Sequence, residues 1–142
     1  MTNRRSGRSA RGSMTIWMLG LCVSVLFLGG LAVDLWRVIE LRRSLAATAD
    51  AVADAGANGL DVAELRRGGT RLDPRLAERL AVEQLGQEPE GDRAEDVRID
   101  ATSAEIEVEL VATVEFSLLG IFVVGDPIEV HARSTGEPRR SA

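Results

Sequence analysis

Acidic, histidine and cysteine side chains are the residues of this sequence that could do chemistry. Glu105, Glu107 and Glu109 recur at every second position, so in a strand they share one face. A flat face does not supply the cage of about six to eight oxygens that calcium needs. His131 stands on the polar side of a similar alternating run, which is typical of a solvated residue. Cys22 is the only cysteine and lies in an apolar run, so an intrachain disulfide and a cysteine-based metal site are excluded.

No catalytic signature accompanies these residues. The sequence contains no HExxH, GxSxG, GxxxxGK[ST] or CxxC motif. We therefore expect no enzyme, no cofactor and no bound metal. The chain carries 17 basic and 22 acidic residues, and the basic residues before the apolar run are Arg4, Arg5, Arg8 and Arg11. The remainder is net acidic without a basic cluster, which argues against nucleic acid as a partner.

The most pronounced feature of the sequence is an uncharged apolar run at residues 14–33. A helix of this length rises about 30 Å, which matches the hydrocarbon core of a bilayer. Trp17 and Trp36 lie near its two ends, where indole rings favour the membrane interface. A cleaved signal peptide is the alternative, because Gly30-Leu31-Ala32 resembles a signal-peptidase site. The length of the run and its helical continuation favour a transmembrane helix, and the basic tail favours a cytoplasmic N-terminus.

Helical periodicity continues beyond the apolar run. Gly56, Asn58 and Gly59 supply a stop signal, so the sequence predicts one helix from Met14 to Ala57. Its second half carries an apolar stripe at three- and four-residue steps. The residues of the stripe are Leu35, Val38, Ile39, Leu45, Ala46, Ala49, Val52 and Ala53.

The rest of the chain predicts a small α+β domain. A short helical turn is expected at residues 61–67 and a second helix from Asp73-Pro74 to Gly86, where Asp is the N-cap and Pro the first helical residue. Alternating patterns predict strands at residues 97–100, 105–116 and 128–133. A turn at residues 102–104 joins the first two strands, and the third strand is expected to pair with the second, since Arg133 and the glutamates have opposite charge.

These elements give a single α+β fold. Residues 1–13 form a basic cytoplasmic tail, 14–33 the transmembrane helix and 34–60 its extracytoplasmic continuation, whose stripe covers the apolar face of the three-stranded antiparallel sheet. The small domain spans residues 61–134, and residues 135–142 are a flexible tail. The link at residues 117–127 is unusually apolar for a connection between strands. It is expected to fold onto the core, to lie on the membrane surface, or to dock a partner.

Three segments in order carry a resemblance to a known family. Their sequences are RGSMT at residues 11–15, VDLWR at 33–37 and LAATADAVADAGA at 45–57. Together they resemble the N-terminal region of TadE/TadG-like Flp pilus-assembly proteins, and the short chain is most similar to actinobacterial TadG-related members. The resemblance implies a bacterial cytoplasmic membrane protein of the tight-adherence pilus or secretion machinery. The predicted long helix on a small sheet is, independently, the plan of a type IV pilin.

The resemblance also implies a processing site at Gly12 and Ser13. Cleavage there would make Trp17 the fifth residue of the mature chain, where pilin-like proteins usually carry Glu. This departure favours an uncleaved anchor, although a pseudopilin remains the other option.

The leading hypothesis is a non-enzymatic component that acts through protein–protein contacts with other pilus-assembly or envelope proteins and with the lipid bilayer, and that is free to self-associate. Two segments are expected to contact partners, the Ala-rich helix face and the apolar link. Their residues are Ala46, Ala49, Val52, Ala53, Leu118, Leu119, Ile121 and Phe122. The alternative hypothesis is a membrane-tethered binding module that captures an envelope ligand on the acidic face formed by Glu105, Glu107 and Glu109.

Overall fold

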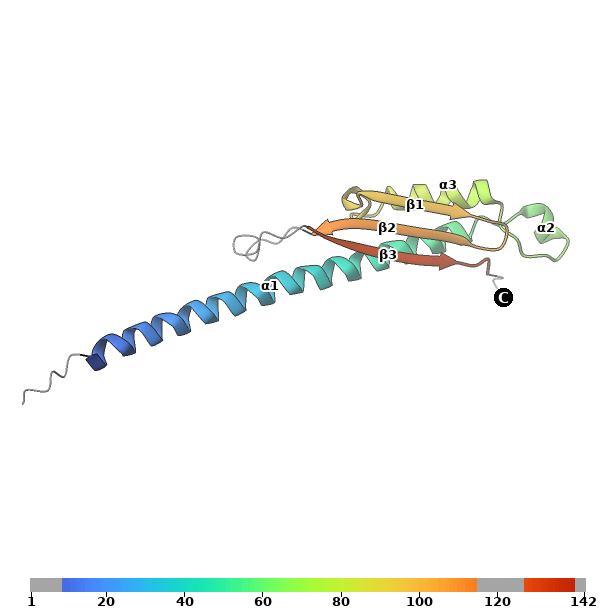
Figure 1. Cartoon of the computed structure of the whole chain (residues 1–142). Coiled ribbons are helices and arrows are strands. Elements are labelled where there is room, and N and C mark those ends of the chain that lie inside the picture. The colour runs from blue at the N-terminus through green and yellow to red at the C-terminus, as the bar shows by residue number, and fades with distance from the viewer. Residues whose placement is uncertain (1–8, 115–126, 140–142) are drawn as a thin grey trace, which may run out of the picture.

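A single long helix runs through most of the molecule and carries a small sheet at one end (Figure 1). The structure is a computed structural model and describes residues 9–114 and 127–139. Helix α1 spans Ser9–Ala57, so it begins five residues earlier than Met14, the predicted start, and ends where the sequence predicts. No proline interrupts it, and Gly59 follows in the turn that ends the helix.

Two aspartates start the two shorter helices. Asp61 precedes α2 (Val62–Arg66) and accepts a hydrogen bond from the backbone N–H of Ala63 at 2.8 Å. Asp73 precedes α3 (Pro74–Leu85) and accepts from the backbone N–H of Arg75 at 3.1 Å. Both carboxylates satisfy N–H groups that a helix leaves without an internal partner. The predicted helix starts and the end at Gly86 are therefore confirmed.

The three strands form one antiparallel sheet in the order β1-β2-β3. Strand β1 spans Asp96–Ala101, β2 spans Ile106–Val114 and β3 spans Ile128–Gly136. Ala101 pairs with Ile106 across the β1–β2 turn, and Ile106 in turn pairs with Gly136 of β3. A short 3-10 helix, η1 (Gly91–Arg93), lies between α3 and β1.

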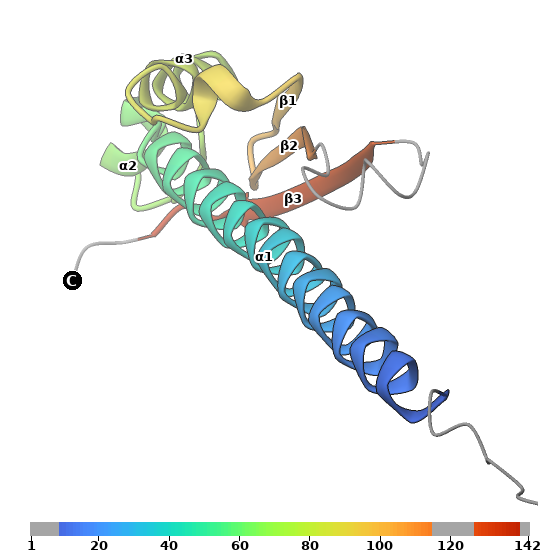
Figure 2. The ribbon, with the colours of Figure 1, turned by 90° about the vertical axis from the view of Figure 1, so that its left-hand side faces the viewer.

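One face of the sheet is covered by helices, and the other is open to solvent. Helix α1 packs on β2 and β3, and α3 packs beside α1 and over β1. The end-on view in Figure 2 shows α1 and α3 together on one side of the strands. From Ile106 to Thr113, strand β2 alternates between buried and half-buried residues, because successive side chains point to the covered and the open face of the sheet. The prediction that the long helix covers the sheet is confirmed, and Val38, Leu45, Ala49, Val52 and Ala53 of the predicted stripe pack there. Leu35, Ile39 and Ala46 of the same stripe are instead exposed.

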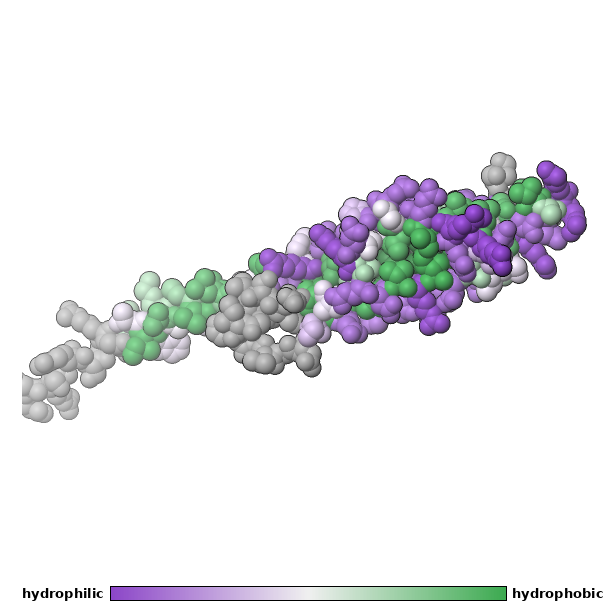
Figure 3. All heavy atoms as spheres, turned by 90° about the horizontal axis from the view of Figure 1, so that it is seen from above, coloured by the Kyte–Doolittle hydropathy of each residue, from purple (hydrophilic) through white to green (hydrophobic). Residues whose placement is uncertain are grey.

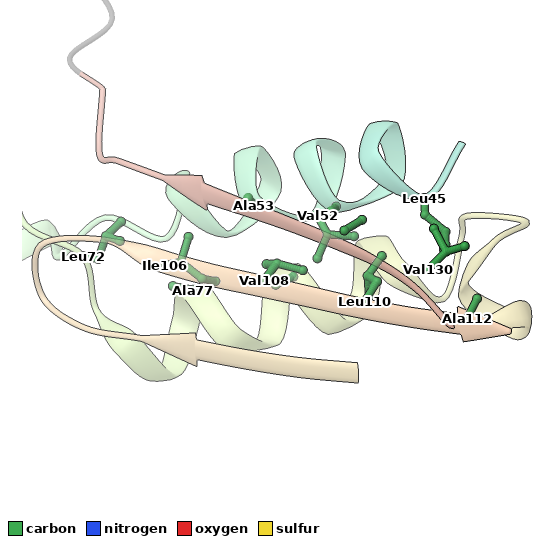
Figure 4. Close-up of a cluster of buried hydrophobic side chains, with 13 residues drawn as sticks. Leu45, Val52, Ala53, Leu72, Ala77, Ile106, Val108, Leu110, Ala112 and Val130 are labelled. Atoms are coloured by element: carbon green, nitrogen blue, oxygen red, sulfur yellow. The ribbon is translucent and has the colours of Figure 1, made fainter. Parts of the chain in front are cut away.

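The core is small and built from slender side chains. Helix α1 contributes Leu45, Ala49, Val52 and Ala53, which meet side chains of α3 and of the strands (Figure 4). The strands and α3 contribute Ile106, Val108, Leu110, Ala112, Val130, Ala132, Ala77 and Ala81.

Two predicted boundaries differ in the structure, and one predicted segment lies outside the described residues. Strand β3 continues to Gly136, so residues 135 and 136 belong to the sheet and not to a flexible tail. It does so because Gly136 pairs with Ile106 and lies against α1. The helix start at Ser9 places residues 9–13 of the predicted tail in α1. The apolar link at residues 117–127 falls almost entirely outside the described residues, and so do the predicted contact residues Leu118, Leu119, Ile121 and Phe122.

Candidate functional site

Most of the exposed large hydrophobic side chains that the structure describes lie in the first part of α1, between Met14 and Ile39. Trp17 is 78% exposed and Leu26 is 75% exposed, and nearly every residue from Met14 to Gly29 is exposed. Figure 3 shows this stretch mostly in the colours of hydrophobic residues, whereas the folded end is mostly hydrophilic. A soluble protein would not leave so large a patch uncovered. The helix is long and apolar enough to cross a membrane.

The surface of α1 changes character at Asp34. Gly30 and Asp34 are both buried, and they are one helical turn apart on the same face. This face continues through the half-buried Val38 and Leu41 to the fully buried Leu45. The family-like segment at residues 33–37 therefore marks the point where an exposed helix becomes a helix with one buried side.

The Ala-rich segment of α1 turns out to be an internal packing surface. Ala49, Val52 and Ala53 are at most 1% exposed, because they lie against the protein's own sheet and α3. A partner cannot reach these three side chains while the domain is folded. Ala46 is exposed on a different side of the helix and stays available to a partner. The sequence suggested that this segment both covers the sheet and contacts a partner. In the structure Ala49, Val52 and Ala53 cover the sheet, and Ala46 is left for a partner.

Glycines allow the close approach between α1 and its neighbours. A Cβ atom at Gly136 would lie 2.4 Å from the carbonyl oxygen of Ala53, and one at Gly59 would lie 2.6 Å from the backbone nitrogen of Ala77. Both contacts are with backbone atoms, which cannot rotate away. Gly59 ends the Ala-rich segment, whereas Gly136 lies in a strand where the sequence gave no sign of a packing role.

The outer face of the sheet is charge-paired and not simply acidic. Arg133 donates to Glu107 across β3 and β2, and the guanidinium of Arg98 donates to Asp100 at 2.8 Å within β1. Glu109 stands between these two arginines in the register of the sheet. Glu105 is exposed at the end of the turn before β2 and takes no part in the paired face. The predicted acidic row therefore needs correction, since neighbouring strands place cations between its carboxylates.

These ion pairs hold the arginines in the charged form. The hydrogen bond and the charge of Asp100 raise the pKa of Arg98 above its ordinary value, and Glu107 raises the pKa of Arg133 in the same way. Both guanidiniums are fully exposed to solvent. The pairs therefore set the charge pattern of the surface but contribute little to stability.

His131 also lies on this outer face, as its place in the sequence predicts. Its Nε2 atom is 3.6 Å from a carboxylate oxygen of Glu129, and its Nδ1 atom is 3.8 Å from one of Glu109. More than half of the side chain is exposed. Among the described residues, no group of three or more histidine, cysteine, aspartate or glutamate side chains is placed to hold a metal ion.

The backbone of Gly12 and Ser13, the predicted processing site, lies within α1. The described part of the chain thus defines an α+β protein in which one long apolar helix, suited to a membrane, carries a small antiparallel sheet. Residues 12–59 match the model of a family described as putative Flp pilus-assembly TadE/G-like. The match covers nearly all of α1 and ends at Gly59. No curated protein and no solved structure gives a significant match to the chain.

Proposed function

We propose that this protein is a non-enzymatic, membrane-anchored component of a Flp/Tad-type pilus assembly or secretion complex. One observation carries the proposal: the family match coincides with α1, whose first half is exposed and apolar and whose second half packs on the sheet. In this arrangement the N-terminus is cytoplasmic and the sheet lies outside the cytoplasmic membrane. The protein acts through contacts with other proteins of the machine.

The exposed flank of α1 is the surface that best suits a partner helix. Leu28, Leu35, Ile39 and Ala46 follow one another at steps of seven, four and seven residues, so they lie on one side of the helix. All four are exposed, and Leu35 is 57% exposed although it lies beyond the apolar span. A partner helix that follows this flank out of the bilayer beside the sheet passes Arg42, which is exposed on the same side between Ile39 and Ala46, and has to leave room for its guanidinium. The small side chain of Ala46 allows close approach at the far end.

Site-directed cross-linking in the native host tests this contact. In a Cys22→Ser background, we expect Ala46→Cys to cross-link to a protein of the assembly machinery. Ala47→Cys is the matched control, because Ala47 is also exposed but lies about 100° around the helix. Equal cross-linking from both positions would contradict a defined helix contact. Deletion of the gene tests the wider proposal: unchanged piliation and an unchanged membrane complex of the partners would refute it.

The alternative function, an envelope-binding module with an acidic face, has less support. Glu107 is already paired with Arg133, and Arg98 and Arg133 flank Glu109 in the sheet register. A cationic ligand would have to displace these arginines. The alternative predicts that Glu105→Gln, Glu107→Gln and Glu109→Gln abolish function while the assembled complex stays intact. Under the leading proposal these variants retain function.

A further inference from the structure

Three arginines follow the apolar span of α1 within ten residues. Arg37, Arg42 and Arg43 are all exposed, and the exposed indole of Trp36 adjoins them. Glu40 is the only exposed acid between residues 34 and 49, so the segment is locally basic in a chain whose net charge is −5. None of the ion pairs between described residues involves Arg42 or Arg43. The guanidiniums of Arg42 and Arg43 are therefore available to an external anion.

The geometry of the helix directs these side chains toward the bilayer. If the hydrocarbon ends at Val33, Trp36 and Arg37 lie about 5–6 Å beyond it by helix rise, within the headgroup layer. Arg42 and Arg43 lie about 14–15 Å beyond it. Every Cα–Cβ bond of a helix tilts toward the N-terminus, which for α1 is the membrane side. The headgroup layer is about 5–8 Å thick, so Arg37 lies within it, whereas Arg42 and Arg43 reach its outer edge by extending their long side chains back toward the membrane.

We propose that Arg42 and Arg43, together with Arg37 and Trp36, form a collar that binds anionic phospholipid headgroups on the leaflet nearest the sheet. The guanidinium fork suits phosphate oxygens, and the indole suits the interface. The inference rests on the membrane insertion of α1 but not on which side of the membrane the sheet occupies. The collar fixes the height of the sheet above the bilayer, because α1 continues from the collar into the sheet without a break.

Lipid selectivity in reconstituted vesicles tests the collar. The full chain is placed in phosphatidylcholine vesicles, with Arg4, Arg5, Arg8 and Arg11 replaced by Gln to remove the other basic segment. Electron spin resonance then compares spin-labelled phosphatidylglycerol with spin-labelled phosphatidylcholine in the lipid shell around the protein. We expect phosphatidylglycerol to be enriched at least about two-fold at low salt, and the enrichment to fall at high salt.

A matched pair of double variants decides the outcome. Arg42→Gln/Arg43→Gln should bring the enrichment close to unity. Arg66→Gln/Arg71→Gln should leave it unchanged, since these arginines are also exposed and take part in none of the ion pairs between described residues, but belong to α2 and the loop after it. The proposal is overturned if the Arg42/Arg43 variant keeps the enrichment, or if both pairs lower it equally. Because the assay uses purified protein, its failure is distinct from a failure of the pilus-assembly proposal.

Discussion

Replacing Gly136 by Ala should loosen the contact between α1 and the sheet. The new Cβ atom would lie 2.4 Å from the carbonyl oxygen of Ala53 and 3.1 Å from Cγ2 of Ile106. Ordinary carbon–oxygen contacts begin at about 3.3 Å, so strand β3 and helix α1 must separate by roughly 1 Å. Over-packing of this kind costs about 1–3 kcal/mol, although loss of glycine's freedom in the unfolded chain offsets up to about 1 kcal/mol. We expect a net loss near 2 kcal/mol.

Hydrogen exchange of the backbone amides, measured by mass spectrometry on the full chain in detergent, shows which elements lose stability. A loss of about 2 kcal/mol accelerates exchange of the β2 and β3 amides roughly thirty-fold, provided that they exchange through opening of the sheet. Gly86→Ala is the control, because a Cβ there meets nothing closer than 3.6 Å and the backbone φ of −68° suits any residue. Wild-type exchange in Gly136→Ala would show that α1 and β3 do not need glycine to pack.

Three further predictions concern the caps, the outer face and the N-terminus. Asp73→Ala should destabilise α3 by about 1 kcal/mol, seen as faster exchange of the α3 amides, because Asp73 caps the first turn. Arg133→Met should leave the free energy of unfolding nearly unchanged, since its pair with Glu107 is exposed to solvent. Because the pKa of Arg133 is raised, an increase in pH removes the pair's contribution only where arginine itself deprotonates, so the effect of Arg133→Met should not vary between about pH 7 and 9. Mass spectrometry of the membrane fraction should find a chain that retains residues 2–12, because Gly12 lies within a helix and Trp17 occupies the place of the usual Glu; a chain that begins at Ser13 would instead indicate a pseudopilin.

The elements of the fold could be predicted from the sequence because their signals are local. Asp73-Pro74 marks a helix start by its own hydrogen bonding and geometry, and the alternation from Ile106 to Val114 marks a half-buried strand. The pairing of β3 with β2 followed from the charge of Arg133 opposite the glutamates. Each of these inferences needed only neighbouring residues or one complementary pair.

The surface roles could not be predicted in the same way because they depend on tertiary neighbours. Ala46 and Ala49 look equivalent in an alanine-rich helix, but only the sheet decides that Ala49 is buried and Ala46 is not. The glutamates of β2 predicted an acidic face, whereas Arg98 and Arg133 join that face only through strand register. Gly136 gave no signal, since its role depends on a backbone carbonyl 83 residues earlier in the chain.

The uninterrupted helix α1 has a mechanical consequence. Its 49 residues form a rod about 74 Å long, and the sheet packs against the part of it that begins at Val38. No proline lies along the rod, and none of its glycines falls between Gly30 and Gly56, so it has no obvious hinge between the apolar span and the sheet. A rotation or an axial push applied to the apolar span is therefore delivered to the sheet almost undiminished. A protein built in this way is suited to transmit displacement from one side of a bilayer to the other as a stiff rod.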